Sequence, residues 1–325
     1  MRILVLGGTR FMGRTLVETL NSRGDSVTIL TRGQVDDPFG KVVNRLVCDR
    51  TDRADFRKLL RESGEWDVVV DFLAYKPVES EDAVAVLSGS VGHFVHISTG
   101  SVYAVGQRTH NGPITEEDVE NPAIPRPTKA PQGWDYGMGK RGCEEVLLEA
   151  YGVHGFPETR IRIPIVQGPW DYTLRAWRYQ LWLQSGHRVE LLDGGRFKYT
   201  HIYSKDVVSA ILKVVEKGEK AQGQAYNFAQ AEPLTHREYL EEVAAHLGVE
   251  PAFFTQSSRR TGPEKRSPWH PFGFDHDIVM DTTKAKKELG WKATPIDRWL
   301  PLTLDWFDSP KNPFAPPKDP PWSDG

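Results

Sequence analysis

The first thirteen residues, MRILVLGGTRFMG, place a short apolar run directly before a turn that contains three glycines. The run Ile3–Leu6 is apolar throughout and ends in glycine, which is typical of a buried β-strand entering a tight turn. After the turn, apolar residues recur at helical spacing from Phe11 to Leu20, and Gly24 marks the stop. A strand, a glycine turn and a helix in this order predict the start of a β-α-β unit.

The rest of the first 150 residues alternates short apolar runs with segments of helical period. Strands that are apolar throughout indicate a parallel sheet covered by helices on both faces. We therefore expect an α/β fold, with a Rossmann-type doubly wound parallel sheet and a smaller α+β C-terminal lobe. The expected strands are 1–8, 25–33, 42–49, 66–74, 93–99, 159–163 and 225–229, and the expected helices are 11–24, 54–63, 83–87, 136–151, 206–216, 235–248, 282–291 and 295–307.

The glycine turn points to a nucleotide cofactor. In such a turn a pyrophosphate meets the free backbone N–H groups at the N-terminus of the next helix, and glycines permit its close approach. The strict pattern of three spaced glycines is not met, because Arg10 stands at the middle position, and a purely structural turn is the alternative. The position at the start of a β-α-β unit favours the cofactor. The residues assigned to this site are Gly7, Thr9, Arg10, Phe11, Met12 and Gly13.

The ends of the second and third strands bear on the choice between NAD and NADP. An acid after the second strand would bind the ribose hydroxyls of NAD, whereas an arginine accommodates the 2′-phosphate of NADP. The chain has Thr31 and Arg32 there, and Arg10 would lie close by, so NADP is favoured over NAD. Two solvated arginines are the alternative. Asp49 suits either the adenine amino group or a simple turn. Further cofactor candidates are Arg50, Leu73, Ala74, Ile163 and Ile165.

The alternating pattern changes after Pro164, where aromatic and basic residues mix with glycine turns. Most of the ten tryptophans lie at or after Trp170, in the part of the chain that would select the substrate. The expected division is an NAD(P)-binding domain at 1–164 to which 206–228 returns, a substrate-binding lobe at 165–205 and 229–308, and a proline-rich tail at 309–325 that lies extended over the surface.

Composition excludes several classes of protein. The 325-residue chain is 39% hydrophobic and 26% charged, which excludes disorder as the dominant state. A net charge of -3 argues against a broad nucleic-acid or membrane surface. Two cysteines, Cys48 and Cys143, cannot form a disulfide framework, so a reduced, cytoplasmic protein is expected. The run Ile3–Leu6 is too short for a signal peptide. No metal site is expected, because His201 has no second His or Cys at ligand spacing.

Tyr136 and Lys140 are four residues apart on a predicted helix, so both side chains project from one face. An ammonium beside a phenol lowers the phenol pKa and helps it to exchange a proton near neutral pH. Such a pair also arises by chance. The fifth predicted strand ends in ISTGS, which places the hydroxyls of Thr99 and Ser101 at the edge of the sheet where ligands bind. Ser and Thr at strand ends are otherwise common turn formers, but the three features in this order favour an active site.

With these motifs the chain resembles the extended short-chain dehydrogenase/reductase superfamily, the group of NAD-dependent epimerases and dehydratases. The GGTRF start resembles a subgroup that includes chloroplast stem-loop-binding proteins. By this resemblance, Thr99 orients the substrate hydroxyl, Tyr136 is the acid/base, and Lys140 holds the ribose and tunes Tyr136. Hydride passes between a substrate carbon and C4 of the nicotinamide. The matching segments are GGTRF, STGSVYA, YGMGK, RIPIVQGP, THIYSKDV and DTTKAKKELGWKATPIDRWLPLTLDWF.

Departures from the family pattern bear on the reaction. Dehydratases carry an Asp-Glu pair directly after the strand-end Thr, where this chain has Gly100 and Ser101, so dehydration is disfavoured. The remaining hypotheses are an NAD(P)-dependent epimerase acting on a nucleotide sugar, an NADP-dependent reductase or dehydrogenase of a smaller carbonyl compound, and an RNA-binding or scaffold protein. The RNA-binding or scaffold hypothesis conflicts with the net negative charge of the chain and gives the set of Thr99, Tyr136 and Lys140 no function.

The substrate contacts depart from the family as well. Relatives place Asn where this chain has Ile165, and the arginine expected to bind a diphosphate is displaced to Arg196 and Lys198, which flank its position. The residues assigned to the substrate are Ser101, Trp170, Arg175, Arg178, Arg196 and Lys198, although aromatics at helical spacing are more often core. Residues 105–134 are expected to form a loop over the substrate. The resemblance implies a homodimer through the helix that bears Tyr136, and no nucleic-acid or membrane partner is expected.

Overall fold

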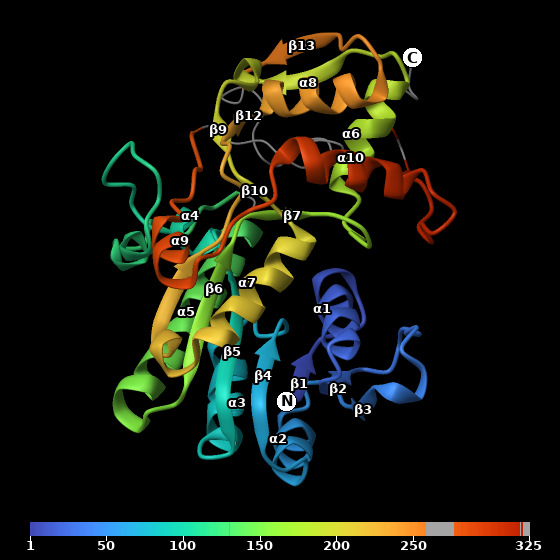
Figure 1. Cartoon of the computed structure of the whole chain (residues 1–325). Helices are drawn as coiled ribbons and strands as arrows, with labels where there is room; N and C mark the ends of the chain where they lie inside the picture. Colours follow the sequence, from blue (N-terminus) through green and yellow to red (C-terminus); the bar gives the residue numbers. More distant parts are fainter. Residues whose placement is uncertain (130, 258–275, 319, 321–325) are drawn as a thin grey trace.

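A seven-stranded parallel sheet forms the larger part of the molecule (Figure 1). The computed structural model describes residues 1–129, 131–257, 276–318 and 320. The strand order, β11-β6-β5-β4-β1-β2-β3, confirms the expected doubly wound Rossmann-type fold and creates a ligand crevice at the carboxyl ends of β1 and β4. The strands are β1 (Arg2–Leu6), β2 (Ser26–Thr31), β3 (Asn44–Val47), β4 (Trp66–Asp71), β5 (Val91–Thr99), β6 (Glu158–Ile163) and β11 (Gln224–Asn227).

Helices cover both faces of this sheet. Successive side chains of a strand point to opposite faces. On β1, Val5 therefore packs in the layer of α1 and α7, whereas Leu4 packs in the layer of α2, α3 and α5. None of the described helices is both long and apolar enough to cross a membrane. These helices are α1 (Phe11–Ser22), α2 (Arg53–Glu62), α3 (Pro77–Leu87), α5 (Gln132–His154) and α7 (Ser204–Lys217), and the short α4 (Ser101–Ala104) follows β5.

The start of α5 differs from the expected position by four residues, since the helix begins at Gln132 rather than at Tyr136. The backbone N–H of Asp135 donates to the carbonyl of Pro131 at 2.8 Å. The carboxylate of Asp135 accepts two hydrogen bonds of 2.7 Å from Arg126. The pair holds an acidic side chain in the first turn of the helix, where it interacts favourably with the helix dipole. Tyr136 therefore lies inside α5 and not at its fraying end.

A smaller lobe lies above the carboxyl edge of the sheet (Figure 1). Its core is aromatic: Trp177, Trp182 and Trp299 are buried, and Trp177 stacks on Phe307 with ring centroids 5.4 Å apart. These tryptophans therefore stabilise the lobe itself, which agrees with the expectation that aromatics at helical spacing are more often core. The lobe contains α6 (Arg175–Gln184), α8 (His236–Leu247), α10 (Ile296–Phe307), β8 (Val189–Leu192) and β13 (Phe253–Gln256).

Helix α8 illustrates why these local segments are helical. The hydroxyl of Thr235 accepts a hydrogen bond from the N–H of Glu238 at 3.1 Å, and the Glu238 carboxylate accepts one from the N–H of Thr235 at 2.8 Å. This reciprocal capping satisfies two N–H groups that the helix itself cannot pair. Tyr239, Leu240 and Val243 then point from one face of α8 into the core of the lobe.

Short ladders join the two regions. After β6, Pro164 ends the sheet strand, and β7 (Ile165–Gln167) pairs with β10 (His201–Tyr203). A second ladder pairs β9 (Lys198–Tyr199) with β12 (Leu234–Thr235). Helix α9 (Thr283–Leu289), in the range 229–308 that the sequence assigns to the substrate lobe, instead contacts α7 and β11 of the sheet region. The rest of the division into a cofactor-binding domain and a substrate-binding lobe stays a proposal.

The segment 105–134, between the strand-end Thr99 and Tyr136, is hydrogen-bonded both to α5 and to the C-terminal part of the chain. Arg141 of α5 donates to the carbonyls of Val119 and Asn121. The N–H of Ile114 donates to the carbonyl of Val279 at 2.7 Å. In the tail, Phe314 packs on Trp306 at 6.1 Å, and residues 319 and 321–325 lie outside the described residues.

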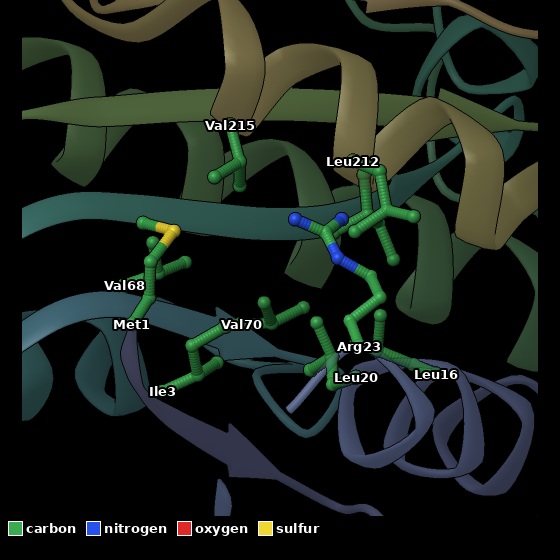
Figure 2. Close-up of a pocket in the computed structure, with 10 residues that line it drawn as sticks. Met1, Ile3, Leu16, Leu20, Arg23, Val68, Val70, Leu212 and Val215 are labelled. Carbon is green, nitrogen blue, oxygen red and sulfur yellow. The ribbon is translucent and has the colours of Figure 1, made fainter. Parts of the chain in front are cut away.

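The amino end of the sheet contains a small apolar cavity of about 10 Å³ (Figure 2). Because ligands bind at the carboxyl ends of the strands in doubly wound folds, we assign no function to this cavity. Arg23 is the charged residue in its lining, which consists of Met1, Ile3, Leu16, Leu20, Arg23, Val68, Val70, Ile211, Leu212 and Val215.

Candidate active site

The glycine turn between β1 and α1 is shaped to receive a phosphate group. A side chain at Gly13 would clash with the carbonyl oxygen of Gly7, so only glycine lets the helix approach the turn this closely. Gly7 itself has a φ of 97°, in the left-handed region. No side chain caps the N-terminus of α1 at Arg10, so the first N–H groups of the helix stay available to a ligand. The turn therefore fits the pyrophosphate of a dinucleotide.

The ends of β2 and β3 carry the residues expected at the ribose and the adenine. Arg32 is exposed and lies near Asp49, whose pKa is lowered by hydrogen bonds from Thr51 and, in smaller part, by the charge of Arg32. The Asp49 carboxylate accepts these bonds from the hydroxyl and N–H of Thr51 at 2.7 and 2.9 Å, so it also forms a turn. Arg10 lies over the ring of Tyr172, 5.6 Å from its centroid. That Arg10 and Arg32 flank a 2′-phosphate therefore stays a prediction, with Arg10 placed over Tyr172 and Arg32 near Asp49.

Arg50, which the sequence suggested as a cofactor ligand, is buried and forms an ion pair within the protein. It is 5% exposed, and Nη1 donates to both carboxylate oxygens of Asp71 at 2.8 and 2.9 Å. Asp71 also accepts hydrogen bonds from the N–H groups of Leu73 and Ala74 at 2.7 and 3.2 Å. The ion pair thus shapes the loop after β4, and this loop holds Leu73 against Gly7 of the glycine turn. Arg50 acts on the cofactor site through the position of this loop.

The strand-end hydroxyls and Tyr136 meet at the carboxyl edge of the sheet. Thr99 is the last residue of β5, and its hydroxyl accepts a hydrogen bond from the N–H of Ser101 at 3.2 Å and lies 3.3 Å from the Ser101 hydroxyl. Thr99 also hydrogen-bonds the phenol of Tyr136 on α5. Gly137 allows this approach, because a side chain there would clash with the carbonyl oxygen of Ser101. Three side chains that can bind a substrate oxygen therefore lie together.

Lys140 lies one turn beyond Tyr136 and is 2% exposed. Its ammonium donates to the carbonyl oxygens of Ala74 and Ile97 at 2.8 and 2.5 Å. Burial lowers the pKa of Lys140, and the nearby charge of Asp71 partly offsets this effect. Lys140 thereby joins the loop after β4 to the end of β5.

The pKa of Tyr136 is raised, mainly because the phenol is partly buried. The hydrogen bond with Thr99 and the positive charge of Arg175 partly offset this effect. The spacing of Tyr136 and Lys140 predicts that the ammonium lowers this pKa, but the ammonium is bound by the backbone carbonyls of Ala74 and Ile97. Tyr136 is therefore a neutral phenol near neutral pH and is suited to donate a proton.

Two further tyrosines surround Tyr136. The rings of Tyr75 and Tyr136 are 6.2 Å apart, and the ammonium of Lys140 lies 5.4 Å from the Tyr75 centroid. Burial raises the pKa of Tyr75 to about 12, and Tyr172 acts electrostatically on both Tyr75 and Tyr136. Tyr75 was not expected at the site, although it directly follows the candidate Ala74 at a strand end. Tyr172 belongs to the aromatic and basic segment that the sequence placed near the substrate, but its position beside Tyr136 depends on the fold.

The structure brings two of the six residues assigned to the substrate to the site. Arg175 begins α6 and acts electrostatically on Tyr136, and Ser101 lies beside Thr99, so the structure brings both to the site. Arg178 donates to the carbonyl of Thr173 at 3.0 Å and holds the preceding loop. The other three lie elsewhere: Trp170 packs on Arg14 at 3.4 Å, Arg196 packs on Phe197 at 4.8 Å, and Lys198 is an exposed residue of β9.

The far side of the site is apolar. Ile163 ends β6 and is 4% exposed, and Ile165 pairs with His201 in the ladder of β7 and β10. Beyond the strand-end Thr99, a side chain at Gly100 would lie 3.2 Å from the sulfur of Met280. The site therefore has apolar walls next to the hydroxyl cluster.

A doubly wound sheet with a glycine turn and a Thr-Tyr-Lys set at its carboxyl edge defines a dinucleotide-binding fold of the extended short-chain dehydrogenase/reductase class. The chain belongs to the NAD dependent epimerase/dehydratase family, whose sequence model matches residues 3–229.

Relatives of known name cover most of the chain. It is 26% identical over 308 residues to the chloroplast stem-loop binding protein of 41 kDa b of Arabidopsis thaliana, covering 90% of this chain and 75% of that protein. It is 24% identical over 324 residues to a 4-hydroxy-2-methyl-3-oxo-4-farnesyl-3,4-dihydroquinoline-1-oxide ketoreductase of Stigmatella aurantiaca, covering 90% and 92%. The fold matches that of dTDP-glucose 4,6-dehydratase from Bacillus anthracis in complex with NAD, with a TM-score of 0.75, 19% identity and coverage of 97% and 98%.

Proposed function

We propose that this protein is an NAD(P)-dependent enzyme that transfers a hydride at a hydroxyl or carbonyl carbon of its substrate. The observation that carries the proposal is the meeting of Thr99, Ser101 and Tyr136 at the carboxyl edge of the sheet, the edge that also carries the glycine turn. Catalysis explains why two hydroxyls and a phenol converge at this edge.

The residues of the site divide the chemistry between them. Thr99 and Ser101 orient the oxygen of the substrate by hydrogen bonds, and Tyr136 donates a proton to that oxygen or removes one from it. Lys140 holds the loop after β4 and, by resemblance to the family, also binds the ribose of the cofactor. The bound cofactor supplies or accepts the hydride.

Epimerisation of a nucleotide sugar is the first candidate reaction. The structural neighbour named above is a dTDP-glucose dehydratase, which supports a nucleotide sugar as the substrate class. Dehydration itself is disfavoured, because Gly100 and Ser101 supply no carboxyl group after Thr99, and Met280 occupies the space beside Gly100. Thr99, Tyr136 and Lys140 would position the substrate oxygen and exchange its proton, while the nicotinamide would take up the hydride and return it to the other face of the same carbon.

Reduction of a smaller carbonyl compound is the second candidate. The ketoreductase relative supports it, as do the apolar Ile165 and the surface positions of Arg196 and Lys198, which leave the expected diphosphate contact unformed. A non-catalytic RNA-binding role, suggested by the stem-loop-binding relative, is the least favoured candidate, because the net charge is -3 and the hydroxyl cluster would have no purpose.

One experiment separates these candidates. The protein is incubated with NAD⁺ or NADP⁺ and UDP-glucose or dTDP-glucose and, in separate reactions, with NADH or NADPH and a panel of ketones. An epimerase changes the sugar, detected by NMR, with no net change in cofactor absorbance, whereas a reductase consumes one cofactor per product. If Tyr136→Phe retains activity within a few-fold of the parent, the catalytic assignment is wrong.

We also propose NADP as the preferred cofactor, a cytoplasmic location and a homodimer. Arg32 supports NADP, and the two free cysteines support a reducing compartment. Helix α5 exposes Leu148, Tyr151 and Val153, an apolar group suited to pairing with a second copy. Light scattering tests the dimer: Leu148→Glu is expected to give a monomer, and an unchanged mass would contradict this interface.

A further inference from the structure

The loop between β7 and α6, residues 168–174, reaches across to the N-terminus of α1. The guanidinium of Arg14 lies over the ring of Trp170, 3.4 Å from its centroid, and Trp170 packs on Trp306 of α10 at 5.1 Å. Two residues on, Tyr172 meets the ring of Phe11 edge-on at 6.5 Å. The loop thus joins the smaller lobe to the turn that fits a pyrophosphate.

Backbone strain is concentrated at this junction. Phe11, Trp170 and Leu174 have φ values of 44°, 68° and 57°, and in the described residues they are three of the four non-glycine residues with positive φ. Each such conformation is unfavourable for a residue with a side chain and persists only where the surroundings impose it. Such strain collects at ligand sites, so the junction is a candidate binding element in its own right.

Part of this loop is held by buried hydrogen bonds, whereas the ring of Tyr172 is exposed to solvent. Asp171 is fully buried and accepts hydrogen bonds from the N–H and hydroxyl of Thr173 at 2.9 and 2.5 Å. Arg178 donates to the carbonyl of Thr173 at 3.0 Å. Tyr172, between these anchors, is 50% exposed. The buried anchors therefore fix the position of the exposed ring.

Arg10, a residue of the glycine turn, lies over the ring of Tyr172. Its guanidinium lies 5.6 Å from the Tyr172 centroid, and within the described ranges it makes no hydrogen bond or ion pair. An arginine stacked on an aromatic face keeps its N–H groups free at the edge, and these groups suit the oxygens of a phosphate. Arg10 also precedes the free N–H groups of α1, which attract the same charge.

We propose that residues 168–174 are a cofactor-binding strap, in which Tyr172 holds Arg10 in place to bind the diphosphate of the dinucleotide and Trp170 fixes the strap on Arg14 and Trp306. The inference rests on the proposed function, because it requires a dinucleotide in the glycine turn. It changes the role of Trp170 from a substrate contact to a support of the cofactor site. It also makes Arg10 a ligand of the diphosphate, common to NAD and NADP, and not of the 2′-phosphate.

The test measures dissociation constants of NADH and NADPH by their fluorescence, with the full chain and its variants. Arg10→Gln and Tyr172→Ala are each expected to weaken both cofactors by about tenfold, the effect of losing one charge-assisted hydrogen bond. The double variant is expected to be little weaker than either single variant, because one residue acts through the other. Tyr172→Phe keeps the ring and is expected to bind as the parent does.

Arg188→Gln is the matched control, since Arg188 packs on Phe254 at 5.6 Å in the smaller lobe. It is expected to bind both cofactors as the parent does. Thermal unfolding of each variant shows whether it is folded. If Arg10→Gln weakens NADPH alone, Arg10 binds the 2′-phosphate and the strap proposal is overturned. The proposal also fails if Tyr172→Ala binds both cofactors within twofold of the parent. If the parent itself binds neither, the proposed function fails instead.

Discussion

Arg162 and Glu144 form a fully buried ion pair beneath the catalytic strand. Nε of Arg162 lies 3.0 Å from both carboxylate oxygens, Nη2 lies 2.5 Å from one of them, and the side chains are 1% and 3% exposed. Glu144 lies one turn beyond Lys140 on α5, and it accepts a hydrogen bond from Ser98, the residue before Thr99. The pair therefore ties α5 to β5 and β6 directly behind the site.

Removing one partner of this pair is expected to destabilise the fold. The pKa of Glu144 is lowered although burial alone would raise it, because Arg162 and Ser98 hold the carboxylate. Glu144→Gln leaves the guanidinium without its counter-charge and should lower the free energy of unfolding by about 3–5 kcal/mol. Urea denaturation measures the loss. The double variant Glu144→Leu with Arg162→Met, which removes both charges, is expected to recover part of it. A loss below about 1 kcal/mol for Glu144→Gln would contradict this role.

Stability should fall with rising pH because of Glu158. Burial raises the pKa of this carboxyl group to about 7, although Arg160 partly offsets the shift. The folded state then holds a proton that the unfolded chain releases near the ordinary glutamate pKa of 4.5, so stability declines as the pH rises from about 4.5 to about 7. The decline is about 3 kcal/mol at most. Unfolding measured at several pH values should show a flatter profile for Glu158→Gln, and identical profiles would disprove the assignment.

Tyr136→Phe is expected to lose about 10²–10⁴-fold in turnover, because the phenol exchanges the proton of the substrate oxygen. The dissociation constant of the cofactor and the melting temperature should change little, since the ring is retained. Tyr151→Phe is the control, because Tyr151 is an exposed tyrosine on the same helix. A loss in Tyr136→Phe that appears only in cofactor binding would show that Tyr136 does not transfer the proton.

Arg32→Gln should distinguish the two nicotinamide cofactors. If Arg32 binds the 2′-phosphate, the variant loses about tenfold in affinity for NADPH and none for NADH, since a charge-assisted hydrogen bond is removed from the first alone. Fluorescence titration with both cofactors measures the ratio. Arg45→Gln, which removes the guanidinium that donates to Asp37 further along the chain, is the comparison and should leave the ratio unchanged. An unchanged ratio in Arg32→Gln itself would remove the support for NADP.

Gly13→Ala should abolish cofactor binding, because the added methyl group clashes with the carbonyl oxygen of Gly7 and opens the turn. Gly133→Ala on α5 meets no atom within 4 Å and is expected to bind normally, with a gain of up to about 1 kcal/mol in stability. Isothermal titration with NADH and NADPH compares the two. Normal binding by Gly13→Ala would show that the turn does not hold the pyrophosphate.

Most of the sheet could be predicted, because its elements carry local signals. The runs before Gly7 and Thr99 are apolar throughout, and the spacing of Tyr136 and Lys140 places them on one helix face. The short strands β7–β10, β12 and β13 carry no such signal. They contain two to four residues each, and their pairing depends on where the chain returns after Pro164.

The local sequence alone specifies the glycine turn, the strand-end hydroxyls and the Tyr136–Lys140 pair, since each depends on residues within one turn or one strand end. The interaction partners of the long side chains, in contrast, depend on the tertiary packing. Arg50 binds Asp71 in the interior, Trp170 packs on Arg14, and Lys140 donates to two carbonyls, because each side chain meets segments distant in sequence. A buried charge must find its partner within the folded core, and residue spacing along the chain does not contain that information.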